Sequence, residues 1–130
     1  MTAITPGTEI PAFEVPEVRI EDIETVMHVM GDFNPVHDDL ELVERLGLRG
    51  PVNQGPANAA YIVNMILRWR PDPAALRSIR YRFHDISCPG DRLVATGTVE
   101  SVEDGLATCS VALTRSTGET VVTGTVVLAV

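Results

Sequence analysis

Lysine is absent from this sequence of 130 residues: all ten basic residues are arginine, against eighteen acidic ones. The formal net charge is therefore −8. An acidic chain argues against nucleic acid as the main partner, because the phosphate backbone attracts basic surfaces. We therefore expect no nucleic-acid interaction.

The arginines are nevertheless unevenly spread, and five of them fall within one short region: Arg68, Arg70, Arg77, Arg80 and Arg82. A cluster of guanidinium groups on an acidic protein can bind a phosphate-bearing ligand. Scattered surface arginines that keep the protein in solution produce the same pattern. The sequence leaves both interpretations open and does not say which arginine would contact a ligand.

Cysteine is scarce, and long hydrophobic runs are missing. Cys88 and Cys109 have no spacing typical of a metal site or a redox pair, so we expect two reduced thiols and neither metal nor cofactor. No apolar run approaches the roughly 20 residues of a membrane-spanning helix. Residues 1–17 have neither the basic start nor the apolar centre of a signal peptide. We expect a cytoplasmic protein that does not contact membranes.

Apolar residues, by contrast, are plentiful: they make up 45% of the chain, and the mean hydropathy is +0.13. That content is enough for a packed core and argues against disorder. Neither an internal repeat nor a linker interrupts the sequence. We therefore expect a single domain over residues 1–130.

Helical hydrophobic spacing recurs three times in the first half of the chain. The predicted helices span residues 20–30, 39–48 and 55–70. The third opens with Gly55-Pro56, which is a strong start signal, and it is apolar on more than one side. We expect this long helix to be largely buried.

The remaining segments favour strands. Residues 1–12 are predicted to be an irregular lead-in, and Pro16 places a first strand, over 13–19, at a sheet edge. After the long helix, alternating and β-branched runs predict a four-stranded meander. These strands span 76–86, 92–102, 106–115 and 120–130. The economical packing is an α+β fold, in which an antiparallel sheet wraps around one long central helix.

The residues best suited to chemistry lie between the first and third predicted helices. Asp32 and His37 are five positions apart, and Asn34-Pro35 between them forbids a continuing helix. They therefore lie on a turn that can direct a carboxylate and an imidazole at one water molecule. Asp32 capping the turn, and His37 packing against backbone, are the structural alternatives.

Gly55 is the second candidate feature, because it opens the long helix. Unpaired N–H groups and the positive end of the helix dipole favour developing negative charge at such a position. Together with Asp32 and His37, it suits a reaction that deprotonates water while an oxyanion forms. Gly55-Pro56 as ordinary helix punctuation is the alternative.

The stretch GDFNPVHDD resembles the signature of the MaoC-like, or (R)-specific, enoyl-CoA hydratases, which have a hot-dog fold. The matching residues are Gly31, Asp32, Asn34, Pro35, His37 and Asp39. The resemblance extends from about Phe13 to Val130 through a small helix, a glycine that opens the central helix, and a run of strands. It implies a single MaoC-like hot-dog domain.

This resemblance implies a hydration reaction. Asp32 and His37 would hold a water that adds to C3 of a trans-2-enoyl-CoA, and a proton would reach C2 on the same face to give a (3R)-3-hydroxyacyl-CoA. The Gly55 N–H would bind the thioester oxygen, and Asn34 would shape the turn or support Asp32. The acyl-CoA thioester is then the substrate. The family also pairs hot-dog sheets, which implies a homodimer or a heteromer with a second hot-dog subunit.

The later stretch WRPDPAALRSIRYRF resembles the small subunit of the two-component MaoC-like hydratases of actinobacterial steroid side-chain degradation. That subunit carries the Asp and His and pairs with another hot-dog subunit. The resemblance implies a bulky steroid side-chain substrate. The acyl group itself, and whether the chain is active without a partner, stay open.

Departures from the family pattern lie around the long helix. Gln54 stands where many relatives have His, Pro56 removes one N–H, and the helix offers Asn58 and Asn64 but no Ser or Thr. The helix also has no Asp or Glu, where hot-dog thioesterases and fatty-acid-synthesis dehydratases commonly have a carboxylate. This absence disfavours both of those activities. A non-catalytic hot-dog subunit, which binds acyl-CoA or completes a partner's active site, is the alternative function.

Overall fold

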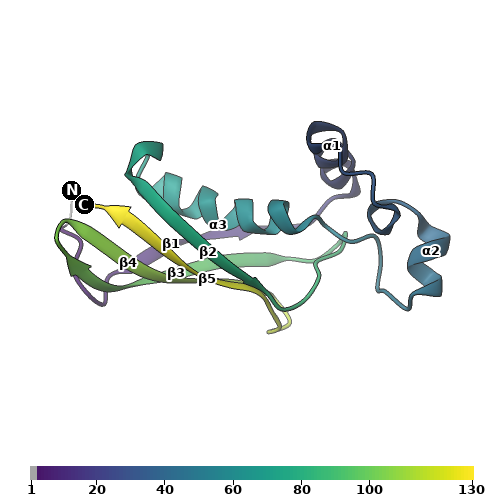
Figure 1. Ribbon diagram of the computed structural model, residues 1–130. Coiled ribbons are helices and arrows are strands. Elements are labelled where there is room, and N and C mark those ends of the chain that lie inside the picture. The colour runs from purple at the N-terminus through teal and green to yellow at the C-terminus, as the bar shows by residue number, and fades with distance from the viewer. Residues whose placement is uncertain (1–2) are drawn as a thin grey trace.

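A five-stranded antiparallel sheet with one long helix across it forms the body of the computed structural model, which describes residues 3–130 (Figure 1). The strands are β1 (Glu9–Val15), β2 (Leu76–Phe83), β3 (Leu93–Glu103), β4 (Leu106–Arg115) and β5 (Thr120–Ala129). The helices are α1 (Ile20–Met30), α2 (Leu40–Arg45) and α3 (Gly55–Trp69), with 3-10 turns η1 (Pro35–His37) and η2 (Pro73–Ala75). Figure 1 shows α3 along one face of the sheet and α1 and α2 beyond the end where α3 begins.

The strand order is β1-β3-β4-β5-β2, which corrects the predicted four-stranded meander. Strands β3, β4 and β5 do form a meander, through tight turns at Asp104-Gly105 and Gly118, all three with positive φ. Strand β2 instead pairs with β5 at the far edge. The connection from β2 to β3, residues 84–92, is longer than a hairpin loop and permits this crossover.

Strand β1 begins earlier than predicted, because a proline lies inside it. The strand starts at Glu9, and its pairing with β3 shifts register between Ile10 and Phe13. Pro11 lies within that bulge, where a missing N–H costs no ladder hydrogen bond. The predicted irregular lead-in was therefore wrong for Glu9 to Ala12, whereas the predicted edge position is confirmed.

The core lies between α3 and the sheet. Ile62, Met65 and Ile66 of α3 are buried with residues of every strand except β2, whose Leu76, Ile79 and Tyr81 pack at its border. The opposite face of α3, at Pro56, Ala60, Asn64 and Arg68, is exposed in this chain. The expected burial therefore holds for one face of the helix only, because a single sheet covers only one side of it.

The segment from α1 to α2 has the turn that the sequence predicts. Gly31, with φ of 64°, ends α1 by donating its N–H to the Met27 carbonyl. Asp39 begins α2 as its N-cap, accepting the Leu42 N–H at 3.1 Å. The second helix is shorter than the predicted 39–48 and ends at Arg45, just before Gly47 with φ of 70°.

Cys88 and Cys109 are both free and buried, as expected. None of the helices within residues 3–130 combines the length and the apolar character needed to cross a bilayer.

Candidate active site

The turn that carries Asp32 and His37 is held by short-range hydrogen bonds. Asp32 Oδ1 accepts the Asn34 N–H at 3.3 Å, and Asn34 Oδ1 accepts the Val36 N–H at 3.2 Å. Pro35 follows at the start of η1. Asn34 thus contacts Asp32 through its backbone and closes the turn with its side chain.

The side chains of Asp32 and His37 meet directly: His37 Nε2 lies 3.1 Å from Asp32 Oδ2. The imidazole is buried, with 8% of its side chain exposed, whereas 38% of the Asp32 side chain is exposed. A water that touches both groups would therefore lie beside the pair, on the accessible side of the carboxylate.

The backbone determines where the proton of His37 lies. Nδ1 is 2.5 Å from the Val52 carbonyl oxygen, which can only accept, so Nδ1 carries a hydrogen. Nε2 then faces a carboxylate oxygen, and a hydrogen bond between these two atoms needs one proton on either of them. A hydrogen-bonded pair therefore joins either imidazolium to carboxylate or imidazole to carboxylic acid. In both states it contains one group that can donate a proton and one that can accept a proton.

The first turn of α3 supplies a candidate oxyanion donor. The N–H of Gly55 has no hydrogen-bond partner within residues 3–130, and Pro56 after it has no N–H. Gly55 also borders an apolar cleft of about 560 Å³ between the exposed face of α3 and strand β2. Among the described residues, the lining of this cleft includes Gly55 but neither Asp32 nor His37.

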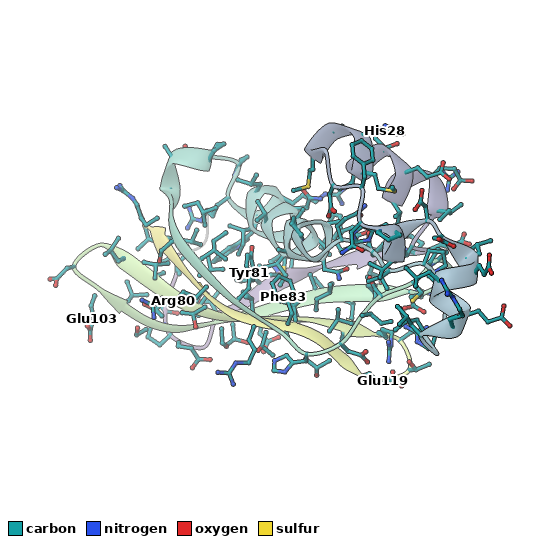
Figure 2. The ribbon with its side chains drawn as sticks, turned by 45° about the vertical axis from the view of Figure 1, so that its right-hand side comes forward. His28, Arg80, Tyr81, Phe83, Glu103 and Glu119 are labelled. Atoms are coloured by element: carbon teal, nitrogen blue, oxygen red, sulfur yellow. The ribbon has the colours of Figure 1, made fainter. Side chains whose placement is uncertain are left out.

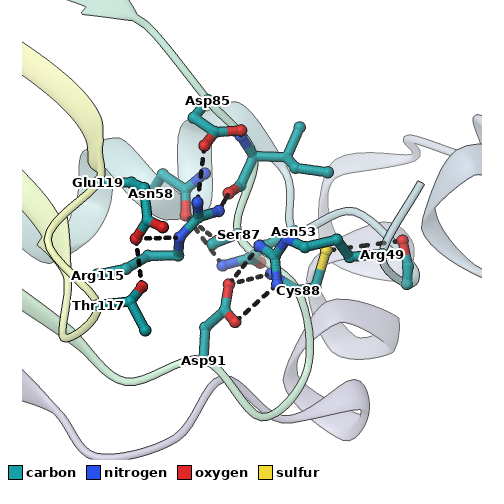
Figure 3. Close-up of polar contacts among 12 residues, drawn as sticks. Arg49, Asn53, Asn58, Asp85, Ser87, Cys88, Asp91, Arg115, Thr117 and Glu119 are labelled. Carbon is teal, nitrogen blue, oxygen red and sulfur yellow. Dashed lines mark hydrogen bonds and ion pairs between the residues drawn. The ribbon is translucent and has the colours of Figure 1, made fainter. Parts of the chain in front are cut away.

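The segment Val52–Gln54 joins the pair to the helix start, and sequence reasoning missed its side-chain contacts. Asn53 Nδ2 donates to Asn58 Oδ1 at 3.2 Å and to the Tyr61 hydroxyl at 3.1 Å. Ser87 Oγ donates to the same Asn58 oxygen at 2.7 Å (Figure 3). Burial raises the pKa of the Tyr61 phenol more than the Asn53 bond lowers it, which keeps that hydroxyl protonated. The signal in the sequence is Asn58, a polar residue on the otherwise apolar buried face of the helix.

The clustered arginines lie on different elements. Arg68 lies over the Phe13 ring at 4.7 Å, and Arg70 lies over the Trp69 ring at 5.5 Å. Arg80 and Arg82 alternate along β2 with cleft residues, so they lie on the sheet face that α3 does not cover. Arg80 and Arg82 are therefore separated from Arg68, whose guanidinium lies over β1 at the opposite edge of the sheet.

The loop before β3 connects the segment that follows α2 to the sheet. Arg49 donates two hydrogen bonds to the carboxylate of Asp91, at 3.0 and 2.9 Å, and the Cys88 N–H adds a third at 2.9 Å (Figure 3). Burial alone would raise the pKa of Asp91, but these donors outweigh it and hold that pKa below its ordinary value.

Residues 5–124 match the model of the MaoC like domain, and the chain belongs to that family. It is 26% identical over 89 residues to enoyl-CoA hydratase 2, peroxisomal, of Arabidopsis thaliana. The match covers 66% of this chain and 29% of that protein, so the chain spans less than a third of that relative.

Solved structures share the whole fold at lower identity. The ChsH1-ChsH2 complex from Mycobacterium tuberculosis matches with a TM-score of 0.86 and 22% identity over 98% of each chain. R-hydratase PhaJ1 from Pseudomonas aeruginosa gives 0.86 and 21%, over 97% of this chain and 82% of that one. The (R)-hydratase from A. caviae involved in PHA biosynthesis gives 0.89 and 17%, over 100% and 99%. These likenesses confirm the predicted hot-dog fold.

Asp91→Asn should destabilise the protein in a pH-dependent way. The folded-state pKa of Asp91 is lowered, so its stabilisation is present above the unfolded-state pKa of about 3.9 and is lost as pH falls further. We expect a loss of about 1–2 kcal/mol in urea unfolding at pH 7, since Arg49 is half exposed. The difference from wild type should shrink towards pH 3.

Glu17→Gln, at an exposed position, is the control and should leave the pH profile unchanged. A difference between Asp91→Asn and wild type that stays constant from pH 7 to pH 3 would contradict the assignment.

Proposed function

We propose that this protein hydrates a trans-2-enoyl-CoA to a (3R)-3-hydroxyacyl-CoA. The observation that carries the proposal is the Asp32–His37 pair, whose side chains lie within hydrogen-bond distance and whose imidazole is oriented by the Val52 carbonyl. Membership of the MaoC-like family supports it, as do the similarity to an enoyl-CoA hydratase 2 and the fold shared with (R)-hydratases.

The pair can carry out both proton transfers of a hydration. A water oxygen bonds to C3 of the enoyl thioester while its proton passes to the Asp32 carboxylate. The electron pair of the C2–C3 double bond, held briefly as the thioester enolate, takes the Nε2 proton of His37 at C2. The 3.1 Å contact then returns the proton from Asp32 to His37. Positioned acid and base groups of this kind typically contribute ~10²–10⁴-fold.

Gly55 would stabilise the enolate in this scheme. Its N–H has no hydrogen-bond partner among residues 3–130 and lies at the positive end of α3, and the residue borders the cleft. A preorganised donor to an oxyanion typically contributes ~10²–10³-fold. Asn34 would support the reaction indirectly, by holding the Asp32 carboxylate through its own N–H.

The substrate that we propose has a large apolar acyl group, of the steroid side-chain kind that the sequence resemblance implies. The cleft is open and is lined by Val63, Ile79 and Phe83, among others. Its lining carries two polar side chains, Asn64 and Tyr81, and the Tyr81 hydroxyl already donates to the Ala59 carbonyl at 3.3 Å. Such a surface favours apolar carbon over polar groups.

Asp32→Asn and His37→Gln should each lower kcat at least ~10²-fold, because each removes one of the two proton-transferring groups. Asp32→Asn keeps the shape of the side chain, so its melting temperature should change little. The assay is the disappearance of the enoyl thioester, with short-chain and steroid trans-2-enoyl-CoA substrates. Asp38→Asn, an exposed neighbour, is the control.

Full activity in either variant would reject the assignment. A wild-type chain that binds acyl-CoA in calorimetry, yet hydrates no thioester alone or with a hot-dog partner, would favour the non-catalytic subunit instead.

Gly55→Ala should keep the fold and impair the reaction. A Cβ at Gly55 would lie 3.5 Å from Phe83 Cε1 and Cζ, an ordinary contact, and alanine favours helix over glycine. The new methyl group would nevertheless lie where the thioester must approach the N–H. We expect an unchanged or higher melting temperature and a kcat/KM at least ~10-fold lower.

Gly50→Ala is the matched control, because its Cβ would also meet one neighbour, Cys88 Cβ, at 3.5 Å, but away from the cleft. If Gly55→Ala were as active as Gly50→Ala, the oxyanion role of Gly55 would be lost.

We propose that the partner pairs with the edge of β2. Both edge strands of the sheet have an unpaired side, but β1 carries Pro11 and a bulge, two devices that discourage edge pairing. Strand β2 has no proline, and its own register shift, between Leu76 and Ser78, precedes a regularly paired run from Ser78 to Phe83. The cleft lies beside this edge, and Phe83 there is 53% exposed (Figure 2).

The charges on β2 favour a different chain as this partner. Arg80 and Arg82 are exposed on the same sheet face and form no ion pair within residues 3–130, and β2 has no acidic residue. Symmetric antiparallel pairing of two copies, centred anywhere from Ile79 to Phe83, places these arginines opposite or diagonal to their own copies. Like charges at such positions destabilise a sheet. A second hot-dog chain with acidic residues at this edge would relieve the repulsion.

An Arg80→Glu/Arg82→Glu variant can serve as a surrogate for that partner. We expect wild type alone to be monomeric or weakly dimeric, and to associate more strongly as salt is raised. An equimolar mixture with the isotope-labelled variant should form mixed dimers, which salt weakens. Native mass spectrometry distinguishes the species by mass.

Arg45→Glu, on α2, is the control and should not promote mixed dimers. A wild-type homodimer as tight as the mixed one, and insensitive to salt, would overturn the proposed acidic partner.

A further inference from the structure

The three residues before α3 form hydrogen bonds to η1, to α1, to the loop before β3 and to the first turns of α3. The Val52 N–H donates to the Val36 carbonyl at 2.9 Å, and the Val52 carbonyl accepts from His37. The Asn53 N–H donates to the Ser87 carbonyl at 2.8 Å, in the loop before β3. Gln54 contacts α1, the helix that ends just before Asp32. The proposed reaction assigns no role to this contact.

Gln54 is joined to two helices at once. Its Nε2 donates to the Ile23 carbonyl of α1 at 2.9 Å. Its own carbonyl accepts the Asn58 N–H at 3.0 Å, in the first turn of α3. Among the hydrogen bonds of residues 3–130, the one to Ile23 is the bond that links α1 to residues 52–69. Gln54 therefore connects α1, which ends beside Asp32, to α3, which begins at Gly55.

Stability alone does not explain an amide here. Gln54 is fully buried, and its Oε1 has no hydrogen-bond partner in the part of the chain that the structure describes. A buried acceptor without a partner is costly, so an apolar side chain of equal length would remove the cost together with the bond to Ile23. A residue kept only for packing would gain nothing from this arrangement.

We propose that Gln54 is a positioning residue that sets the Asp32–His37 pair at a defined distance from the Gly55 N–H. The inference rests on the proposed hydration, in which C3 must meet the pair while the thioester oxygen meets Gly55. A small displacement of α1 would move the Asp32–His37 pair relative to the Gly55 N–H, so that the substrate could not reach both correctly. Reaction then becomes slower although the substrate still binds, because orientation and not affinity is lost.

Gln54→Met is the decisive variant, because it keeps the length of the side chain and removes both the donor and the unpaired oxygen. The positioning role predicts a melting temperature close to that of wild type, a kcat at least ~10-fold lower and a KM changed less than ~3-fold. Gln54→His, which retains an N–H donor, should restore most of kcat.

Leu128→Ala is the matched control for general destabilisation. Leu128 is buried in β5, where it pairs with Leu76 of β2 and Ala107 of β4 and not with residues 52–54. This variant should lower the melting temperature and leave kcat at 25 °C near wild type. A Gln54→Met variant that loses stability and keeps kcat would overturn the positioning role.

The NMR resonances of the His37 ring give a readout that does not require activity. Loss of the bond to Ile23 should shift them in Gln54→Met, and Gln54→His should return them towards the wild-type values. If wild type hydrates no thioester, the proposed function fails and this readout alone decides the positioning role. Unshifted His37 resonances in Gln54→Met would then overturn it.

Discussion

The hydrogen bond from His37 Nδ1 to the Val52 carbonyl is the interaction on which the chemistry of this site depends. A carbonyl oxygen accepts and never donates, so the bond places one hydrogen on Nδ1 in every state of the ring. Nε2 is thereby directed at Asp32, whose Oδ2 lies 3.1 Å away. A backbone atom, and not a neighbouring charge, therefore determines which ring nitrogen faces Asp32.

The rest of the fold keeps that backbone atom in place. Val52 belongs to a short segment tied to η1, to the loop before β3 and to the first turns of α3. Asp91 and Arg49 fasten the same loop to the region after α2. Hydrogen bonds between segments that are far apart in sequence thus connect the candidate site to the sheet.

The distinction between short-range and long-range contacts explains what the sequence could predict. Gly31, Asn34 and Asp39 form their decisive hydrogen bonds within five positions, so the turn and the helix starts follow from residue type alone. The bond between Ser87 and Asn58 spans 29 positions and leaves no periodic signal. Sequence reasoning therefore recovered the candidate pair and missed the network behind it.

The same limit applies to the sheet. The strand Leu106–Arg115 was predicted with its observed bounds, because alternation and flanking turns are local. The pairing of β2 with β5 was not predicted, because hairpin preferences favour strands that are neighbours in sequence. The path of residues 84–92 instead brings β3 away from β2, and the sequence does not show this path. Strand β1 was placed too late for a different reason: the bulge that accommodates Pro11 is visible only beside its partner strand.

The unequal edges of the sheet limit how large an assembly can grow. Pro11 and its bulge block one border, so each molecule offers a single border for sheet extension. Two molecules that join there leave no further border of that kind, and growth stops after one step. One imino acid at the β1 edge thus disfavours the repeated strand addition by which fibres grow.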